Sequence, residues 1–453
     1  MLEIKEKKKD GLISDLVRIV GEDAVLYKPV DLMAYECDGF TLERAMPRAV
    51  VLPSSTEEVS QVVKYLHDRD IPFLARGAGS GLSGGSIPIH GEVIISLVRM
   101  KKILHIDYEN RYAVVQPGLV NLRLSQAIEP RGYYYAPDPS SQSICTIGGN
   151  VAENAGGAHC FKYGVTTNHI LGLQFVLPNG DIMQVGQGGV PDPPGYDLLG
   201  LLTGSEGTLA IVTEITVKIL KKPEGQKTVL AYFDDVAHAS QAVADIIAAG
   251  IVPVALEMMD KIAIEGVESA AFPVGHPKGL EALLLIEVDG ILAGLDEQIE
   301  EIIQVCKQNH VKEVRAAKDE EERARWWANR KTGFGAMGAI SSDYLVQDGC
   351  IPPSTLPTVL KKIGEISKET GLRIANIFHA GDGNIHPLIL FDARKPGEKE
   401  LALKAGTKCL EVCAQAGGSI TGEHGVGIEK REEMRFIFTE EELERQIRLR
   451  DEV

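Results

Sequence analysis

Residues 75–85 read ARGAGSGLSGG, a chain of small residues between two β-rich stretches, IPFLARG at 71–77 and EVIISL at 92–97. The pattern GxGxxG occurs here at Gly79, Gly81 and Gly84. A dinucleotide fingerprint of this kind needs a helix to begin at the loop, so that the helix N-terminus meets the pyrophosphate. Pro88 and a β-rich run follow instead, which excludes a Rossmann domain. Two interpretations remain: an anion-binding nest of backbone N–H groups, or a flexible hairpin loop.

The sequence on either side of this loop predicts short strands and helices separated by Gly and Pro. Residues 48–52 (RAVVL) predict a strand. Residues 54–70 predict a helix, because Ser55 and Glu58 have the spacing of a capping box and apolar residues then recur at helical spacing. Further strands are predicted within 112–116, 171–177 and 208–220. The layout is α+β, with a boundary near Lys222 and Pro223.

The pattern changes beyond this boundary. Strands are predicted at 227–233, 253–259, 282–290 and 311–317, with helices at 236–250 and 295–309. The order β-α-β-β-α-β is that of a ferredoxin-like unit. A second, partial round follows, with strands within 343–353, 373–380 and 386–392 and helices at 355–370 and 398–415.

Composition and charge exclude several classes of protein. The chain has 453 residues and a formal net charge of −17, and this acidic balance gives no basic surface for nucleic acid. The basic cluster at Lys5 to Lys9 is followed by a stretch that Asp15 and Arg18 interrupt, so no signal peptide or membrane span is predicted and a cytoplasmic location is expected. Seven cysteines without CxxC give no disulfide framework, and Cys409 and Cys413 are expected to pack on one helix face.

Two further glycine-rich stretches, CTIGGNVAENAGG at 145–157 and LLTGSEGTLAIVTEITV at 201–217, follow in an order and spacing that resembles the FAD-binding domain of the vanillyl-alcohol oxidase family. The resemblance implies an α+β protein with an N-terminal helical segment (1–45), a two-subdomain FAD-binding domain (46–222) and a C-terminal ferredoxin-like substrate-binding cap domain (223–453). It assigns a pyrophosphate loop and turn to Arg76, Gly77, Ala78, Gly79, Ser80, Gly81, Leu82, Ser83, Pro117 and Gly118. It assigns the isoalloxazine and ribityl segment to Pro137, Asp138, Ser141, Thr146, Gly148, Gly149, Asn154, Gly156 and Gly157. The strand entry that closes the site is Glu206, Gly207, Ile211 and Val212.

One departure from that family concerns how FAD is held. Members that attach FAD covalently through this loop carry His in RSGGH, whereas the matching position here is Ser80. We therefore expect non-covalent FAD. His159 lies nearby in sequence but in a different loop, and we expect it to be structural or solvated.

The C-terminal region gathers histidines and a carboxylate. His379 and His386 flank a Gly-rich turn, and Glu423 and His424 follow in GGSITGEHGVG. Two imidazoles and one carboxylate can form an open divalent metal site, although histidines near turns are more often only hydrogen-bonded. Both segments resemble the D-2-hydroxyacid dehydrogenase branch, which includes D-lactate dehydrogenase and the flavin subunit of glycolate oxidase. That resemblance assigns His379, His386 and Glu423 to a metal (Zn, Mn or Fe) and His424 to the catalytic base.

Three other positions complete the expected site. Arg330, in RARWWANRKTG, matches the residue that binds the substrate carboxylate, a role that suits a bidentate guanidinium. Asn384 is expected to face flavin or substrate. The hydroxyglutarate branch carries Lys where this chain has Gln347, so a small monocarboxylate fits better than a dicarboxylate. Relatives usually end in a segment that returns to the flavin domain. The ending differs here, so the sequence does not predict how the flavin pocket is closed.

The resemblance implies oxidation of a small D-2-hydroxy acid, D-lactate or glycolate, to the 2-oxo acid, with hydride passing to flavin N5. Since the sequence has no haem, cluster or nicotinamide motif, the electrons need an external acceptor: an electron-transfer flavoprotein, an iron–sulfur subunit or a quinone. An oligomer or a heteromeric complex is expected, and peripheral membrane association stays open. Two alternatives are an FAD-dependent transferase of the alkyl-dihydroxyacetone-phosphate synthase type and a non-catalytic electron-relay subunit.

Overall fold

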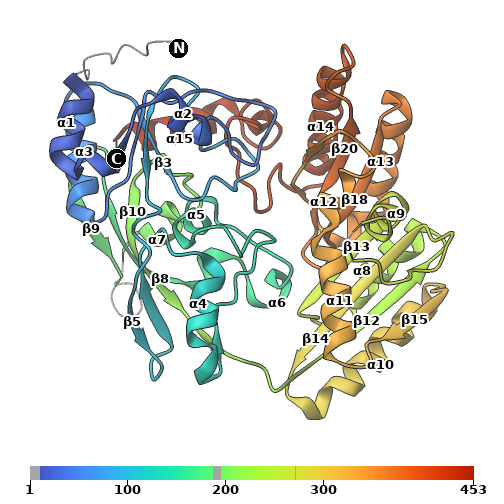
Figure 1. Cartoon of the computed structure of the whole chain (residues 1–453). Coiled ribbons are helices and arrows are strands. Elements are labelled where there is room, and N and C mark those ends of the chain that lie inside the picture. The colour runs from blue at the N-terminus through green and yellow to red at the C-terminus, as the bar shows by residue number, and fades with distance from the viewer. Residues whose placement is uncertain (1–10, 187–194, 271, 453) are drawn as a thin grey trace, which may run out of the picture.

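The computed structural model describes residues 11–186, 195–270 and 272–452. The chain forms two halves that lie side by side, and it passes from the first to the second at residues 222–224 (Figure 1). The last segment then crosses back to the first half. The basic cluster at Lys5 to Lys9 lies outside the described residues. Within the described part of the chain, none of the helices has the length and apolarity needed to cross a membrane.

The first half begins with a four-stranded sheet in the order β1-β2-β4-β3, in which β2, β4 and β3 are parallel. Its strands are β1 (Val25–Leu26), β2 (Ala49–Val51), β3 (Phe73–Arg76) and β4 (Val93–Ser96). Helix α3 (Thr56–His67) connects β2 to β3, and the predicted cap is present, since Ser55 Oγ accepts from Glu58 N. Helix α1 (Gly11–Val20) packs on α3 and shares its apolar core. The glycine-rich loop at 77–85 leaves the end of β3.

A second, antiparallel sheet completes the first half, in the order β5-β6-β10-β8-β9. Its strands are β5 (Ile103–Asp107), β6 (Tyr112–Val115), β8 (Ile170–Val176), β9 (Ile182–Val185) and β10 (Ile211–Lys218). The helices of this part are α4 (Asn121–Ile128), α5 (Ile147–Glu153), α6 (Cys160–Tyr163) and α7 (Leu198–Leu202), and the short strands β7 (Tyr133–Tyr134) and β11 (Leu220–Lys221) pair with each other. The glycine-rich segment 145–157 therefore forms a capped helix and the loop after it.

The second half is built on one large sheet whose first four strands follow the order β15-β12-β14-β13. Its strands are β12 (Gly225–Phe233), β13 (Ala255–Asp260), β14 (Ala282–Gly290), β15 (Glu313–Ala316), β16 (Asp343–Val346), β17 (Gly349–Cys350), β18 (Arg373–His379), β19 (Asn384–Ile385) and β20 (Pro387–Phe391). The order 4-1-3-2 along the chain is that of a ferredoxin-like unit, which confirms the fold class predicted from the strand and helix order. Strand β18 then continues the sheet beside β13.

Helices cover both faces of this sheet. One face packs against α8 (Val236–Ala248), α10 (Leu292–Gln308), α13 (Leu356–Thr370) and α14 (Glu398–Gln415). The other face packs against α9 (Lys261–Glu268), α11 (Glu320–Lys331) and α12 (Gly333–Met337). Helix α9 was not predicted, because it has only 8 residues and Gly266 interrupts its apolar pattern. Cys409 and Cys413 lie on the buried face of α14 and pack into this core, which confirms their predicted packing role.

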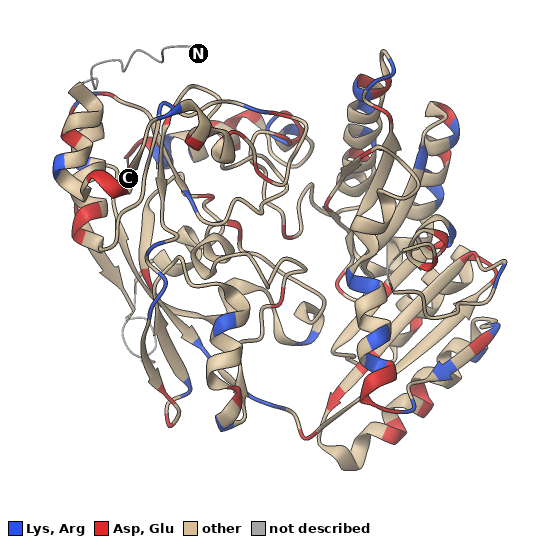
Figure 2. Cartoon of the chain, in the orientation of Figure 1, with Lys and Arg blue, Asp and Glu red and all other residues tan. Residues whose placement is uncertain are grey.

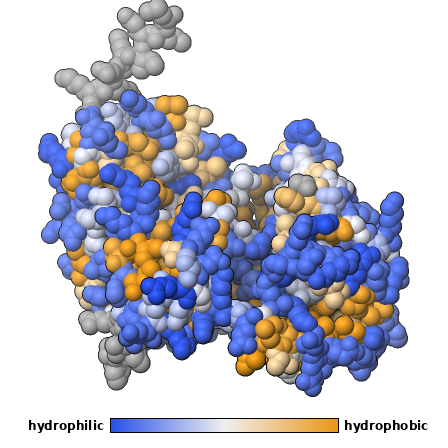
Figure 3. Space-filling model, turned by 60° about the horizontal axis from the view of Figure 1, so that its bottom comes forward, coloured by the Kyte–Doolittle hydropathy of each residue, from blue (hydrophilic) through white to orange (hydrophobic). Residues whose placement is uncertain are grey.

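The surface carries charges of both signs. Figure 2 shows Lys and Arg interspersed with Asp and Glu along the outer helices. On the face drawn in Figure 3, hydrophilic residues dominate and apolar side chains gather in separate groups. The final helix, α15 (Glu440–Glu452), lies on the first half and buries none of its residues.

Candidate active site

A cavity of about 380 Å³ opens between the two halves and is lined by both. The predicted FAD residues in its lining are Arg76, Gly77, Ala78, Gly79, Ser80, Gly81, Leu82, Pro117, Ser141, Thr146, Gly148, Gly149, Glu206, Gly207, Ile211 and Val212. The residues predicted for chemistry, Arg330, His379, His386, Glu423 and His424, line the same cavity. The fold thus brings the three glycine-rich loops and the C-terminal polar cluster to one space.

The remaining predicted FAD residues are absent from that described lining: Ser83, Gly118, Pro137, Asp138, Asn154, Gly156, Gly157 and Asn384. Several of them support the loops instead. Asn154 has φ +52 and ends helix α5, and its Oδ1 accepts from Thr167 N. Ser83 O accepts from Ile428 N at 3.0 Å, which ties the pyrophosphate loop to the C-terminal segment.

The loop after β3 is suited to hold an anion. Among the described residues, the backbone N–H groups of 78–82 donate no hydrogen bond, so they are free for a phosphate. Arg76 does not serve that purpose with its side chain. Its guanidinium donates to Cys37 O at 2.8 Å and to Ser86 O at 3.1 Å, beneath the loop. Gly79, at φ +69, lies over this guanidinium, where a Cβ would come within 2.2 Å of Arg76 Nη2.

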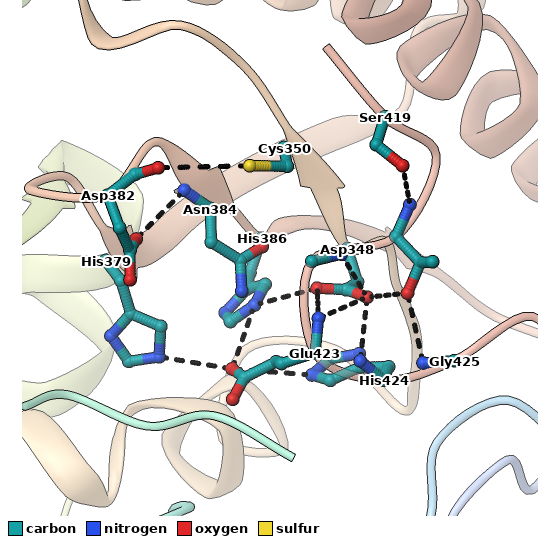
Figure 4. Close-up of polar contacts among 12 residues, drawn as sticks. Asp348, Cys350, His379, Asp382, Asn384, His386, Ser419, Glu423, His424 and Gly425 are labelled. Atoms are coloured by element: carbon teal, nitrogen blue, oxygen red, sulfur yellow. Dashed lines mark hydrogen bonds and ion pairs between the residues drawn. The ribbon is translucent and has the colours of Figure 1, made fainter. Parts of the chain in front are cut away.

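The C-terminal cluster is assembled from two strand ends and one loop (Figure 4). His379 ends β18, His386 precedes β20, and Glu423 lies in the loop after α14. Glu423 Oε1 is 3.2 Å from His379 Nε2 and 3.4 Å from His386 Nε2. The three residues offer ligand atoms that all lie within 4.8 Å of one another.

This donor set fits a divalent metal. Both ring nitrogens of His386 are buried and have no hydrogen-bond partner among the described residues, although buried polar groups are nearly always paired. Burial raises the pKa of Glu423, but His379 and the neighbouring imidazoles lower it to about 2, so the carboxylate is ionised. Two imidazole nitrogens and an ionised carboxylate are the ligands of an open site.

Asp348, which the sequence did not single out, organises the loop that carries Glu423. Its buried carboxylate accepts from Thr421 Oγ1 at 2.6 Å, from His424 N at 2.9 Å and from the backbone N–H groups of 422 and 423. Lys430 Nζ, also fully buried, lies 3.3 Å from Asp348 Oδ2. Burial raises the pKa of Asp348, but His424, Lys430 and His386 lower it well below its usual value. The only signal in the sequence was an Asp after a strand, which is common.

Asp348, His386 and His424 form a second group whose ligand atoms lie close together. It shares His386 with the first. The carboxylate of Asp348 already accepts hydrogen bonds from the 421–424 loop and is neutralised by Lys430, so the group with Glu423 is better placed to take a cation.

His424 stacks on His386, with ring centroids 4.9 Å apart and planes inclined by 21°. Burial lowers the pKa of His424, and although Asp348 opposes this, the value falls to about 4. The imidazole is therefore neutral near pH 7 and can accept a proton in the cavity.

Arg330 reaches the cavity from helix α11 and is 5% exposed. Its guanidinium forms an ion pair with Glu257 on β13, and its Nε has no hydrogen-bond partner among the described residues. A buried guanidinium that lines a cavity and has an unused N–H can bind a carboxylate. Lys331, next to it, is more exposed and lies 5.8 Å from the Trp327 ring.

The C-terminal segment closes the first half. Glu206 accepts from Val426 N and from Gly427 N, both at 2.7 Å. Gly156 packs against the metal-ligand candidate, since a Cβ there would lie 2.9 Å from Glu423 Oε2. Residues 425–429 thus make the return contact to the flavin loops that the sequence left open.

Two further expectations are refined by the geometry. His159 Nδ1 is 2.7 Å from Asp138 Oδ2, and its Nε2 is 3.6 Å from Glu287 Oε1 across the two halves, so it is structural rather than solvated. Gln347 Nε2 donates to Glu429 Oε1 at 3.0 Å and belongs to no described lining of the cavity. Gln347 is therefore not placed to select the size of a substrate in the cavity.

Comparisons with known proteins agree on both halves. Residues 47–186 match the family described as FAD binding domain, and residues 222–451 match FAD linked oxidases, C-terminal domain. The chain is 46% identical over 447 residues to glycolate oxidase subunit GlcD of Escherichia coli K12, covering 97% of this chain and 89% of that protein. It is 32% identical to a D-lactate dehydrogenase of Archaeoglobus fulgidus, covering 96% of each.

Solved structures share the fold at low identity. p-Cresol methylhydroxylase has a TM-score of 0.78 and 19% identity, over 93% of this chain and 90% of that one. An alkyldihydroxyacetonephosphate synthase has a TM-score of 0.74, also at 19% identity, over 91% of this chain and 82% of that one. These likenesses establish the architecture but carry no activity.

Proposed function

Because the chain belongs to the FAD-linked oxidase family, as an FAD-dependent oxidoreductase of the glycolate oxidase and D-lactate dehydrogenase type, we propose that it oxidises a small D-2-hydroxy acid, glycolate or D-lactate, to the 2-oxo acid. The relatives named for glycolate and D-lactate are the basis for the substrate class. One observation carries the proposal: a carboxylate-binding Arg330, a neutral His424 and the glycine-rich flavin loops all line one cavity.

The roles of the residues follow from their geometry. Arg330 binds the substrate carboxylate through N–H groups that Glu257 does not use, which fixes the Cα of the substrate in the cavity. His424 accepts the proton of the substrate hydroxyl at its imidazole, because its depressed pKa leaves it neutral. Residues of both halves line the space around the carbon that loses its hydrogen.

FAD and a divalent metal fit the remaining lining. The free N–H groups at 78–82 would hold the pyrophosphate, and Ser80, in place of His, supports non-covalent binding. His379, His386 and Glu423 would hold the metal. When bound, FAD supplies the two-electron acceptor and the metal supplies Lewis acidity toward the substrate oxygens.

The electrons leave through another protein or a quinone in this proposal. The relative from Escherichia coli is named as a subunit, which supports assembly of this chain into a heteromeric complex. An electron-transfer flavoprotein, an iron–sulfur subunit and a quinone are the acceptor classes to assay, each with the substrate-reduced protein.

An anaerobic absorbance titration tests the function. The holoprotein is mixed with glycolate, D-lactate, L-lactate and D-2-hydroxyglutarate, each with and without a chelator. We expect glycolate or D-lactate to bleach the flavin band, L-lactate to leave it oxidised, and the chelator to abolish bleaching. If no 2-hydroxy acid bleaches the flavin, the proposal is wrong.

The same titration addresses both alternatives. A transferase without net redox change leaves the flavin oxidised with a hydroxy acid alone, and so does a relay subunit that lacks a substrate site. Bleaching by D-lactate or glycolate in the absence of any other reagent therefore excludes both.

A further inference from the structure

Glu257 is a buried carboxylate on the face of the second half's sheet that packs against helix α11. It lies on β13 between Ala255 and Met259, which point to the same face as Trp326 and Trp327 and share their core. Its side chain is 1% exposed. A buried carboxylate is costly unless it is paired, so its partners explain why it is there.

Both partners belong to the active site. In the pairing of β13 with β18, Glu257 lies directly opposite His379, and Glu257 Oε1 is 2.7 Å from His379 Nδ1. The second oxygen forms the ion pair with Arg330. One carboxylate therefore contacts a candidate metal ligand from the strand and the candidate carboxylate clamp from helix α11.

The contact between Glu257 and His379 determines which ring nitrogen of His379 faces the cavity. With Nδ1–H donated to Glu257, the other nitrogen, Nε2, lies 3.2 Å from Glu423 Oε1 and is the nitrogen that would bind the metal on losing its proton. Metal-binding histidines commonly donate their second N–H to a carboxylate, which fixes the ring and raises its basicity.

We propose that Glu257 is a positioning residue that orients His379 for the metal and Arg330 for the substrate carboxylate at the same time. This inference rests on the proposed function for its substrate part and on the His379, His386 and Glu423 set for its metal part. The Glu257 side chain would thus link the metal affinity of the protein to its substrate affinity.

The experiment compares metal affinity in four holoproteins: wild type, Glu257→Gln, Arg330→Gln and the double variant. The dissociation constant of Zn²⁺ or Mn²⁺ is measured by competition with a chelator, without substrate. Glu257→Gln should weaken metal binding about 10–100-fold, the effect typical of a lost carboxylate partner of a ligating histidine. Arg330→Gln keeps the contact between Glu257 and His379 and should bind metal as the wild type does.

The double variant keeps the test valid if the single variant folds poorly. Glu257→Gln alone leaves the buried Arg330 unpaired, which is strongly destabilising, whereas the double variant removes both charges. The double variant should bind metal about 10–100-fold more weakly than Arg330→Gln. Equal metal affinity in these two proteins overturns the proposal.

A matched control lies on the same strand. Asp260 accepts from Asn376 N and Nδ2 on β18 and caps α9, but contacts neither His379 nor Arg330. Asp260→Asn should change stability without changing the metal affinity. A similar loss of metal affinity in Asp260→Asn and Glu257→Gln shows a general effect of strand packing and overturns the positioning role.

The substrate part is read from kinetics with the hydroxy acid. Glu257→Gln should raise KM about tenfold, as expected for loss of one charged partner of the clamp, while the bound flavin stays at the wild-type level. An unchanged KM overturns this part. If the wild type binds metal but no hydroxy acid reduces its flavin, the proposed function fails while the metal comparison still decides the role of Glu257. A wild type that binds no metal overturns the metal part itself.

Discussion

At the scale of single residues, His424 is the group whose loss separates chemistry from binding. It lines the cavity as a neutral imidazole and belongs to the second possible metal group, with Asp348 and His386, but not to the first. His424→Ala should lower the rate of anaerobic flavin reduction at least about 100-fold, the usual contribution of a general base. FAD and metal content should stay at the wild-type level. Loss of the metal along with the activity would instead assign the ion to the group that contains Asp348.

Asp348 and Lys430 are predicted to stabilise the protein as a pair. Asp348→Asn leaves the buried Lys430 ammonium without its counter-ion and weakens the bonds that hold the 421–424 loop. The free energy of unfolding should fall by about 3–5 kcal/mol, measured by urea denaturation of the holoprotein. Adding Lys430→Met in the same chain should recover part of this loss, because the buried ammonium that lost its Asp348 partner is then removed as well. A double variant less stable than Asp348→Asn contradicts the pairing.

The site residues that could be predicted from the sequence differ in their surroundings from those that could not. His379, His386, Glu423 and His424 were predicted because their two sequence segments resemble the D-2-hydroxyacid dehydrogenase branch, whereas their spacing alone only allowed a metal site. Glu257 and Asp348 were not predicted, because a carboxylate in or after a strand looks like any other and its importance depends on partners far away in sequence. Arg76 shows the converse: its place in the loop was predicted, but its guanidinium is used beneath the loop.

At the scale of elements, α6 and its preceding loop are joined to β14 and α11 by a chain of charges. His159 lies between Asp138 and Glu287, and Glu287 accepts two hydrogen bonds from Arg323 and one from Trp327 Nε1. Lys162 and Tyr163 on α6 bind Asp289 on the same strand. These contacts connect the two halves at the side of the cavity where α11 carries Arg330.

This bridge predicts a pH-dependent stability. Burial lowers the pKa of His159, but Asp138 and Glu287 raise it to about 10, above the unfolded value of ~6.5. The stabilisation is therefore complete below about pH 6.5 and is lost as the pH rises toward 10. The difference in unfolding free energy between wild type and His159→Gln should shrink over this range, measured by urea denaturation at fixed ionic strength. A difference that stays constant or grows with pH contradicts a charged bridge.

Elements were more predictable than their contacts. The strand and helix order beyond residue 223 predicted the ferredoxin-like unit, because hydrophobic periodicity is a local property. The extension of its sheet by β18 beside β13 could not be predicted, since it joins strands more than a hundred residues apart. That pairing is what places His379 opposite Glu257.

At the scale of the whole molecule, the two halves enclose the cavity and a short segment fastens them. Residues 425–429 return to the first half, where Glu206 accepts from Val426 N and Gly427 N and Ser83 O accepts from Ile428 N. Glu206 holds φ +54, a conformation that is unfavourable for a residue other than glycine. Such strain persists where surrounding contacts fix it, commonly at functional sites. Glu423 and His424 come immediately before residues 425–429. Closure of the flavin pocket and the position of the catalytic cluster therefore depend on the same loop.

Glu206→Ala is therefore predicted to weaken flavin binding without removing any contact in the polar cluster itself. The variant leaves the N–H groups of Val426 and Gly427 without their acceptor and frees the segment from the glycine-rich loops. The dissociation constant of FAD, measured from the recovery of flavin fluorescence on dilution, should rise about tenfold or more, since two hydrogen bonds to a charged group are lost. Glu214→Ala is the matched control, because Glu214 lies on β10 just beyond Glu206 and outside the described lining of the cavity. It should release FAD as the wild type does. Equal FAD affinity in Glu206→Ala and Glu214→Ala would show that the cavity stays closed without this contact, and closure would then have to come from the packing of the two halves alone.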